Sequence, residues 1–340
     1  MRSIIVKSIL YTIGLAVLFA GFSILYDYRI RRNDNYLILL DHYRDIAASV
    51  RVLILGDSHP AYLHSEELPE GWHNLSFFSE SAYEWYAKLY FALEHSPDLH
   101  TVVIPFDYHN FTSTAARSSN LRNVLRFLDS ESAQDLLSMG WFNFTKVKTG
   151  LLFPLLNSSE RATFQSVLID DIYMFFINKI IDKKQPRQVS VDGNFNLINS
   201  DLTTWDKYTP EERTARALER LEPQFRNGAA NEDLINVFKK LIALCQSRGI
   251  RIIGVKYPLA EEYNSLVHGF ESGSTDKLYS TVKVGGVLDY SRTYEKSPEL
   301  FRNQDHLNDA GNLKFTKRLV GDLLIVLGDQ DRSDDKKAFR

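Results

Sequence analysis

The feature that most constrains the fold is the alternation of short apolar segments with segments of helical periodicity. Residues 51–56, 101–105 and 250–257 are short apolar runs bounded by turn residues, a pattern typical of buried strands. Residues 82–94 and 232–248 carry apolar side chains at helical spacing, which predicts amphipathic helices. Strands that alternate with helices form a parallel sheet covered on both faces. We therefore expect an α/β fold.

The two ends of this pattern can also be placed. Residues 73–76 and 287–289 are candidates for two more short strands. Asn308 is a suitable N-cap for a closing helix that ends near residue 327. The last residues, 329–340, are dense in charge, and we expect them to be disordered.

Residues 111–231 interrupt the alternation. This segment holds apolar helical stretches followed by a polar, Asn-rich passage, and we interpret it as a helical cap inserted into the sheet domain. The expected organisation is thus a membrane anchor at 1–34, one α/β domain at 35–328 that carries the insertion, and the tail.

Residues 8–26 contain no charged side chain and are mostly apolar. A helix of this length rises about 28 Å, close to the hydrocarbon thickness of a bilayer. We favour an uncleaved transmembrane anchor over a cleaved signal peptide or a buried helix. Three arginines follow the segment (Arg29, Arg31 and Arg32), so the charges do not themselves favour export of the domain.

Composition excludes several classes of function. The formal net charge of −3 gives no reason to expect nucleic-acid binding. Cys245 is the single cysteine, so no internal disulfide can form, and no Cys/His cluster has metal-ligand spacing. We expect neither a metal nor another cofactor.

Two short motifs carry the candidate chemistry. Gly56, Asp57 and Ser58 follow the first expected strand, at the carboxyl end where ligands bind in doubly wound sheets. A serine on such a turn can expose its hydroxyl, although a plain Asx-type turn is the alternative. Asp305 and His306 stand just before the closing helix. A serine nucleophile needs an adjacent base, and that base needs an orienting acceptor.

An N-terminal Gly-Asp-Ser turn paired with a C-terminal Asp-His before the last helix resembles the SGNH (GDSL-like) hydrolases, over residues 50–327. The resemblance implies a flavodoxin-like three-layer α/β/α sandwich. It also implies Ser58 as the nucleophile, His306 as the general base, and the backbone N–H of Ser58 as part of the oxyanion hole.

The sequence is most similar to membrane-anchored, extracytoplasmic members that acylate cell-envelope polymers. That similarity implies a periplasmic domain on the inner membrane and a carbohydrate polymer as acceptor. It also implies a polytopic membrane acyltransferase as a partner.

The sequence departs from the family pattern around the histidine. The family acid normally lies three residues before it, where this chain has Asn303. Asn303 can orient an imidazole but supplies no charge. Asp305 is adjacent to His306, and consecutive residues on a short loop usually point apart, so Asp305 is not an obvious substitute for the acid. Both Asn303 and Asp305 are candidate catalytic residues, and which of them orients His306 stays open.

The rest of the expected site is less tightly specified. By the resemblance, Ser79 replaces the oxyanion-hole glycine and Asn110 supplies the family asparagine. His59 either lines the pocket or is a solvated turn residue, and we favour a packing role for His109 over a supporting one. Asp57 is expected to make turn and helix-cap hydrogen bonds.

Three functions remain open. The favoured one is extracytoplasmic, serine-dependent O-acyl transfer, with acetyl as the expected group, to a cell-envelope polysaccharide. The second is hydrolysis of glycan or lipid esters by the same serine. The third is glycan binding by a catalytically impaired protein, which Asn303 keeps open.

Overall fold

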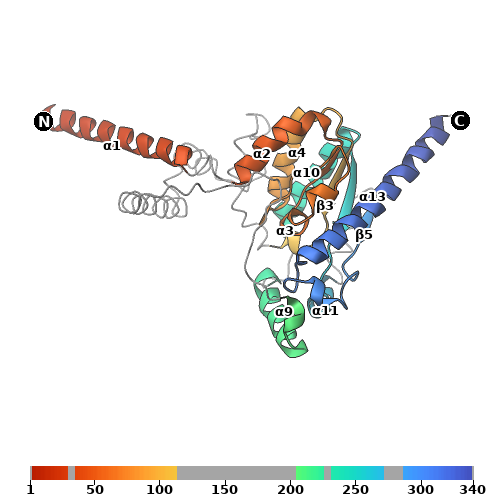
Figure 1. The fold of residues 1–340 in the computed structure, drawn as a ribbon. Coiled ribbons are helices and arrows are strands. Elements are labelled where there is room, and N and C mark those ends of the chain that lie inside the picture. Colours follow the sequence, from red (N-terminus) through yellow and green to blue (C-terminus); the bar gives the residue numbers. More distant parts are fainter. Residues whose placement is uncertain (1, 30–34, 113–203, 226–230, 272–285, 339–340) are drawn as a thin grey trace, which may run out of the picture. The chain divides into compact units, whose positions relative to one another are not determined.

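The computed structural model describes residues 2–29, 35–112, 204–225, 231–271 and 286–338 (Figure 1). Most of the predicted insertion, and with it the predicted cap, lies outside the described residues. Residues 44–121 and 192–340 form one compact unit, which holds the sheet, and helix α1 (Arg2–Arg29) belongs to another. Among the residues that the structure describes, no helix is long and apolar enough to cross a membrane.

The centre of the unit is a five-stranded sheet in which every pair of neighbouring strands is parallel. In spatial order its strands are β2 (Trp72–Asn74), β1 (Val52–Ile54), β3 (Thr101–Pro105), β4 (Arg251–Lys256) and β5 (Val287–Asp289). This 2-1-3-4-5 order is the flavodoxin-like doubly wound order, in which ligands bind beside the first strand. The prediction of an α/β fold with a parallel sheet is confirmed.

The register aligns the start of β1 with both of its neighbours. Val52 lies opposite Trp72 on one side and opposite Thr101 on the other. The chain leaves β1 for β2 on one side and later builds β3, β4 and β5 on the other. The carboxyl end of β1 is therefore the topological switch point, and the Gly-Asp-Ser turn begins there.

Helices cover both faces of the sheet (Figure 1). Helices α4 (Ala82–His95) and α10 (Glu232–Ser247) lie on one face, where the Phe238 ring is 6.4 Å from Trp85 and 5.7 Å from Phe106. Helix α13 (Asp309–Ala338) lies on the other face. Each helix of the first pair starts at a side-chain cap: Ser81 and Glu84 form a capping box on α4, and Asn231 caps α10.

The remaining elements are short or peripheral. They are α2 (Asn35–Ile46), α3 (Ser58–Ala61), α9 (Pro210–Phe225), α11 (Glu261–Glu271) and the 3₁₀ turns η2 (Ala47–Ser49), η3 (Ser65–Glu67), η4 (Tyr108–Phe111), η6 (Trp205–Lys207) and η7 (Pro298–Leu300).

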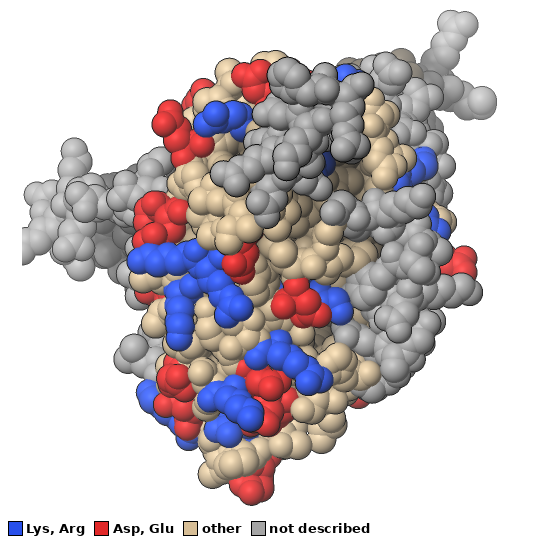
Figure 2. Space-filling view, turned by 90° about the vertical axis from the view of Figure 1, so that its right-hand side faces the viewer, with Lys and Arg blue, Asp and Glu red and all other residues tan. Residues whose placement is uncertain are grey.

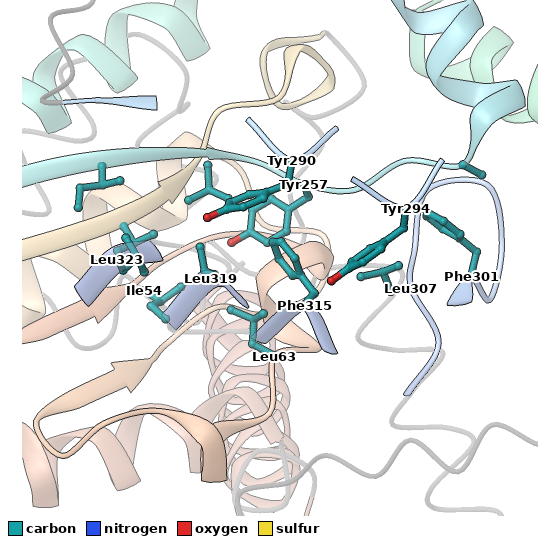
Figure 3. Packing of buried hydrophobic residues seen from close by; sticks show 14 of the residues in the cluster. Ile54, Leu63, Tyr257, Tyr290, Tyr294, Phe301, Leu307, Phe315, Leu319 and Leu323 are labelled. Carbon is teal, nitrogen blue, oxygen red and sulfur yellow. The ribbon is translucent and has the colours of Figure 1, made fainter. Parts of the chain in front are cut away.

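Aromatic packing fixes α13 against the sheet (Figure 3). The Phe315 ring lies 5.6 Å from Tyr257 and 5.1 Å from Tyr290, and all three residues are buried. Leu319 and Leu323 continue the same buried face of α13. Each of these side chains contributes roughly 1.5–3 kcal/mol through burial. The packing determines where the loop before α13 lies, and that loop carries His306.

Two expectations about boundaries need correction. The closing helix does not end near residue 327 but continues to Ala338. No proline interrupts the chain after Gly328, and its charged residues propagate a helix once the preceding turns are packed. The second expected strand is β2, which begins at Trp72 and ends at Asn74 rather than spanning 73–76.

Candidate active site

Ser58 occupies the first position of α3, directly after the β1 turn. Asp57 caps this helix, because its side chain accepts a hydrogen bond from the backbone N–H of His59 at 3.0 Å. Gly56 makes the sharp entry possible: a Cβ at this position would overlap the Pro60 ring and press on Pro105. The predicted capping role of Asp57 is confirmed.

The loop before α13 is held in a tight turn by Asn303. Its side-chain oxygen accepts hydrogen bonds from the backbone N–H of Asp305 at 3.2 Å and of His306 at 2.8 Å. An antiparallel bridge between Phe301 and Leu307 closes the loop. The oxygen of Asn308 accepts from Gly311 N–H at 2.9 Å, so the predicted cap of the closing helix is confirmed.

These two segments bring the predicted nucleophile and base together. Ser58 Oγ lies 2.7 Å from His306 Nε2, although the two residues are 248 positions apart in the chain. On the other side of the ring, His306 Nδ1 lies 3.0 Å from Asp305 Oδ1 and 3.1 Å from Asn303 Oδ1. Because both partners of Nδ1 are oxygen acceptors, Nδ1 carries the proton and Nε2 is free to accept the serine proton.

The expectation that Asp305 points away from His306 is wrong. Asn303 binds two consecutive backbone N–H groups and curls the loop, so the carboxylate of Asp305 turns back toward the adjacent ring. The site therefore has both the family-position amide and a carboxylate on Nδ1. Asn303 mainly shapes the loop, and Asp305 supplies the negative charge.

Asp305 is ionised in this setting. It is 2% exposed, and burial by itself raises the pKa of its carboxyl group. The charges of His306, Arg220 and His59 and a hydrogen bond from His306 outweigh burial and hold the pKa of Asp305 well below its usual range. A buried carboxylate of this kind stabilises an imidazolium on His306.

A second hydrogen-bonded group lies beside the dyad, centred on Asp57. One oxygen of Asp57 lies 3.1 Å from His59 Nδ1, and the other accepts from Asn110 Nδ2 at 2.8 Å and lies 3.0 Å from His109 Nε2. Burial by itself raises the pKa of Asp57, but the two histidines hold it well below its usual range. His109 therefore supports the residue next to the nucleophile, a role that the sequence analysis ranked below simple packing.

His59 is buried rather than solvated, being only 7% exposed. Its ring stacks on His306, with 4.9 Å between the centroids and 10° between the planes. Burial by itself lowers the pKa of His59, but the charge and hydrogen bond of Asp57 outweigh it and raise the pKa to about 9. A small pocket beside the stacked rings is lined in part by Tyr62, Tyr257 and Phe315. His59 thus lies beside this pocket and not on a solvated turn.

Ser79 lies in the loop between β2 and α4. Its φ of 58° is in the left-handed region, where glycine is favoured. Phe77 N–H donates to Gly56 O at 3.1 Å, which joins this loop to the turn before Ser58. Asn110, the predicted oxyanion-hole asparagine, is 1% exposed, and its side-chain N–H donates a hydrogen bond to Asp57.

Among the residues that the structure describes, two groups of side chains have metal-ligand chemistry. Within each group, Asp57–His59–His109 and His59–Asp305–His306, the ligand atoms lie within 4.8 Å of one another. A carboxylate with two imidazoles is a donor set that Zn²⁺ accepts. In the second group, however, the His59 and His306 rings are stacked nearly parallel, so their in-plane lone pairs cannot converge on one ion. In the first, Asp57 already bonds both imidazoles.

Arg220 is a charged residue of the site that was not predicted from the sequence. Arg220, on α9, donates from Nε to Asp305 Oδ2 at 3.0 Å. The two residues are 85 positions apart, and an arginine on an amphipathic helix carries no signal of such a contact. Comparison with known proteins adds no assignment: no protein-family model matches this sequence, and no curated protein matches it significantly.

Proposed function

We propose that this chain is a serine-dependent acyltransferase or esterase with an SGNH-type fold and active site. The observation that carries the proposal is the 2.7 Å separation between Ser58 Oγ and His306 Nε2, with a buried carboxylate 3.0 Å from Nδ1. A nucleophile, a base and an orienting acid in this order are the arrangement that covalent acyl transfer requires.

The chemistry has two steps. In the first, His306 Nε2 takes the Ser58 proton while Oγ attacks the acyl carbonyl, and the imidazolium then protonates the departing alkoxide. Asp305 stabilises the imidazolium through its hydrogen bond with Nδ1–H. In the second step an acceptor hydroxyl gives its proton to His306 and attacks the carbonyl carbon of the acyl-serine. The bond from that carbon to Ser58 Oγ breaks, and the imidazolium returns the proton to Oγ. A sugar hydroxyl gives transfer, whereas water gives hydrolysis.

The backbone N–H of Ser58 is the first candidate donor to the developing oxyanion. It lies at the start of α3, where backbone N–H groups have no partner within the helix. The Ser79 loop is the second candidate, because the Phe77–Gly56 hydrogen bond joins it to the turn before the nucleophile.

We further propose an O-acetyl group as the acyl group and a cell-envelope polysaccharide as the acceptor, with the domain outside the cytoplasm. A polytopic membrane acyltransferase would supply the acyl group. Attachment to a membrane rests on the sequence, in which residues 8–26 contain no charged side chain and are mostly apolar. On the face of the chain drawn in Figure 2, acidic and basic side chains intermingle over the described residues, as a neutral carbohydrate acceptor allows.

The test is hydrolysis of a small aryl acetate with and without an acceptor polysaccharide. Ser58→Ala should lower kcat by at least about a thousandfold. The matched control is Ser247→Ala, an exposed serine at the end of α10, which should leave kcat unchanged. Acetyl esters on the polysaccharide that appear only with Ser58 support transfer, and turnover without them supports the esterase. Equal activity of Ser58→Ala and wild type contradicts the proposal.

A separate test determines on which side of the membrane the domain lies. A C-terminal alkaline phosphatase fusion to the full chain should be active, because that enzyme requires an extracytoplasmic compartment. An inactive phosphatase fusion together with a fluorescent cytoplasmic fusion would remove the envelope polysaccharide as acceptor.

A further inference from the structure

Helix α9 packs on α11 through a small apolar core of its own. Ala217, Leu221 and Phe225 project from α9 and are buried against Tyr263 and Val267 of α11. The Phe225 ring also stacks on Tyr108, with 5.7 Å between the centroids. This packing fixes the position of α9 along and about its helix axis, beside the loop that carries His306.

A polar contact holds the other end of the same helix. Arg213 Nε donates to Glu262 Oε1 at 2.6 Å, and Trp205 Nε1 donates to Glu262 Oε2 at 3.1 Å. Both side chains of the ion pair are largely buried, at 17% and 14% exposed. Arg213 therefore ties α9 to α11 without using any residue of the active site.

Arg220 makes a different contact, directed at the active site itself. Its Nε and Nη2 lie 3.0 and 2.9 Å from the same oxygen, Oδ2 of Asp305. The other oxygen, Oδ1, is thereby left for Nδ1 of His306 at 3.0 Å. Four side chains from three parts of the sequence form one chain of contacts: Arg220, Asp305, His306 and Ser58.

We propose that Arg220 is a positioning residue that holds Asp305 Oδ2, so that Oδ1 stays directed at His306. An aspartate adjacent to its histidine is otherwise free to rotate about its side-chain torsions, and an uncompensated charge that is 2% exposed is costly. The Arg220 guanidinium limits the rotation of the Asp305 side chain and compensates its charge. The inference rests on the proposed serine chemistry and makes α9 a part of the catalytic unit.

The catalytic test compares two arginines of the same helix in the full chain. Arg220→Ala should lower kcat for an aryl acetate about 10- to 100-fold, the loss of one charge-assisted contact, with KM unchanged. Arg220→Lys keeps the charge and should lose less. Arg213→Ala should lower the melting temperature but keep kcat, because Arg213 does not contact Asp305.

Added guanidinium ion should restore part of kcat to Arg220→Ala and none to Arg213→Ala. The Arg220 side chain is 42% exposed, so solvent reaches the space that its removal opens. Equal kcat losses in the two variants would mean that only helix docking matters. A rise in KM with unchanged kcat would mean that Arg220 binds substrate. Either result overturns the proposal.

A readout without turnover separates this inference from the proposed function. In ¹⁵N NMR spectra, the Nδ1–H of His306 should shift in Arg220→Ala and stay in place in Arg213→Ala. If this shift is seen but Ser58 of the wild-type protein proves unreactive, the positioning role of Arg220 holds and the proposed function is wrong. If the Nδ1–H signal does not shift in Arg220→Ala and Ser58 still reacts, the proposed function holds and the positioning role of Arg220 is wrong.

Discussion

Titration of His59 should make the stability of this protein fall at alkaline pH. Its pKa is about 9 in the folded chain, against 6.5 for a free histidine, because Asp57 offsets the effect of burial. A group whose folded pKa is raised contributes stability that is fully present below the unfolded pKa and is lost as pH rises through the folded pKa. The window is therefore pH 6.5 to about 9.

The size of the effect follows from the shift. The difference of about 2.5 pKa units corresponds to about 3 kcal/mol of unfolding free energy, at 1.36 kcal/mol per unit. No discount for solvent screening is needed, since His59 is 7% exposed. Besides Asp57, the charged or titratable groups around the ring are His109, His306, Asp107 and Asp305, and Tyr257 lies beside it.

Urea unfolding of the wild type and of His59→Gln at several pH values between 6 and 10 measures this loss. The wild type should lose about 3 kcal/mol more than His59→Gln over this range. Subtracting one stability curve from the other removes the contributions of other groups that titrate between pH 6 and 10. An NMR titration of the His59 ring in the wild type gives the same answer if the variant folds poorly. Parallel stability curves, or a midpoint near 6.5, would refute the reasoning.

Three further outcomes are expected. Burial first and Glu80 second raise the pKa of Glu84 from 4.5 to about 8, so its stability contribution is present below pH 4.5 and is lost as the pH rises through about 8. In urea unfolding, Glu84→Gln should therefore be about 5 kcal/mol more stable than wild type at pH 9, with the gap closing toward pH 5. Gly311→Ala places a Cβ against a backbone oxygen and should cost about 1–3 kcal/mol, whereas Gly321→Ala, with open space around it, should be neutral or stabilising in thermal unfolding. Asp305→Asn should lower kcat about ten-thousandfold at unchanged KM, by removing the charge beside Nδ1.

The sheet and its main helices were predictable because a continuous apolar run for a buried strand and apolar residues at a period of 3.6 for a helix are both local signals. The Gly-Asp-Ser turn and the C-terminal histidine were predictable for a similar reason, since the end of a strand and the start of a helix can be located from short segments. The structure brings Ser58 and His306 together, as expected.

The orientation of side chains around that pair was not predictable. Asp305 faces His306 only because Asn303 binds two backbone N–H groups, and no spacing rule encodes that turn. The burial of His59 depends on packing against His306 and Tyr257, which come from other strands and loops. Arg220 reaches the site from a helix that the alternation of strands and helices does not place.

Covalent labelling tests the central claim, that Ser58 is an activated nucleophile, most directly. The full-length protein is treated with a fluorophosphonate probe, and the intact mass and the modified peptide are determined. One probe should attach per chain, on Ser58, with no labelling of Ser58→Ala and slow labelling of His306→Ala. A folded wild-type protein that stays unlabelled, or that carries the probe on another serine, would contradict the account.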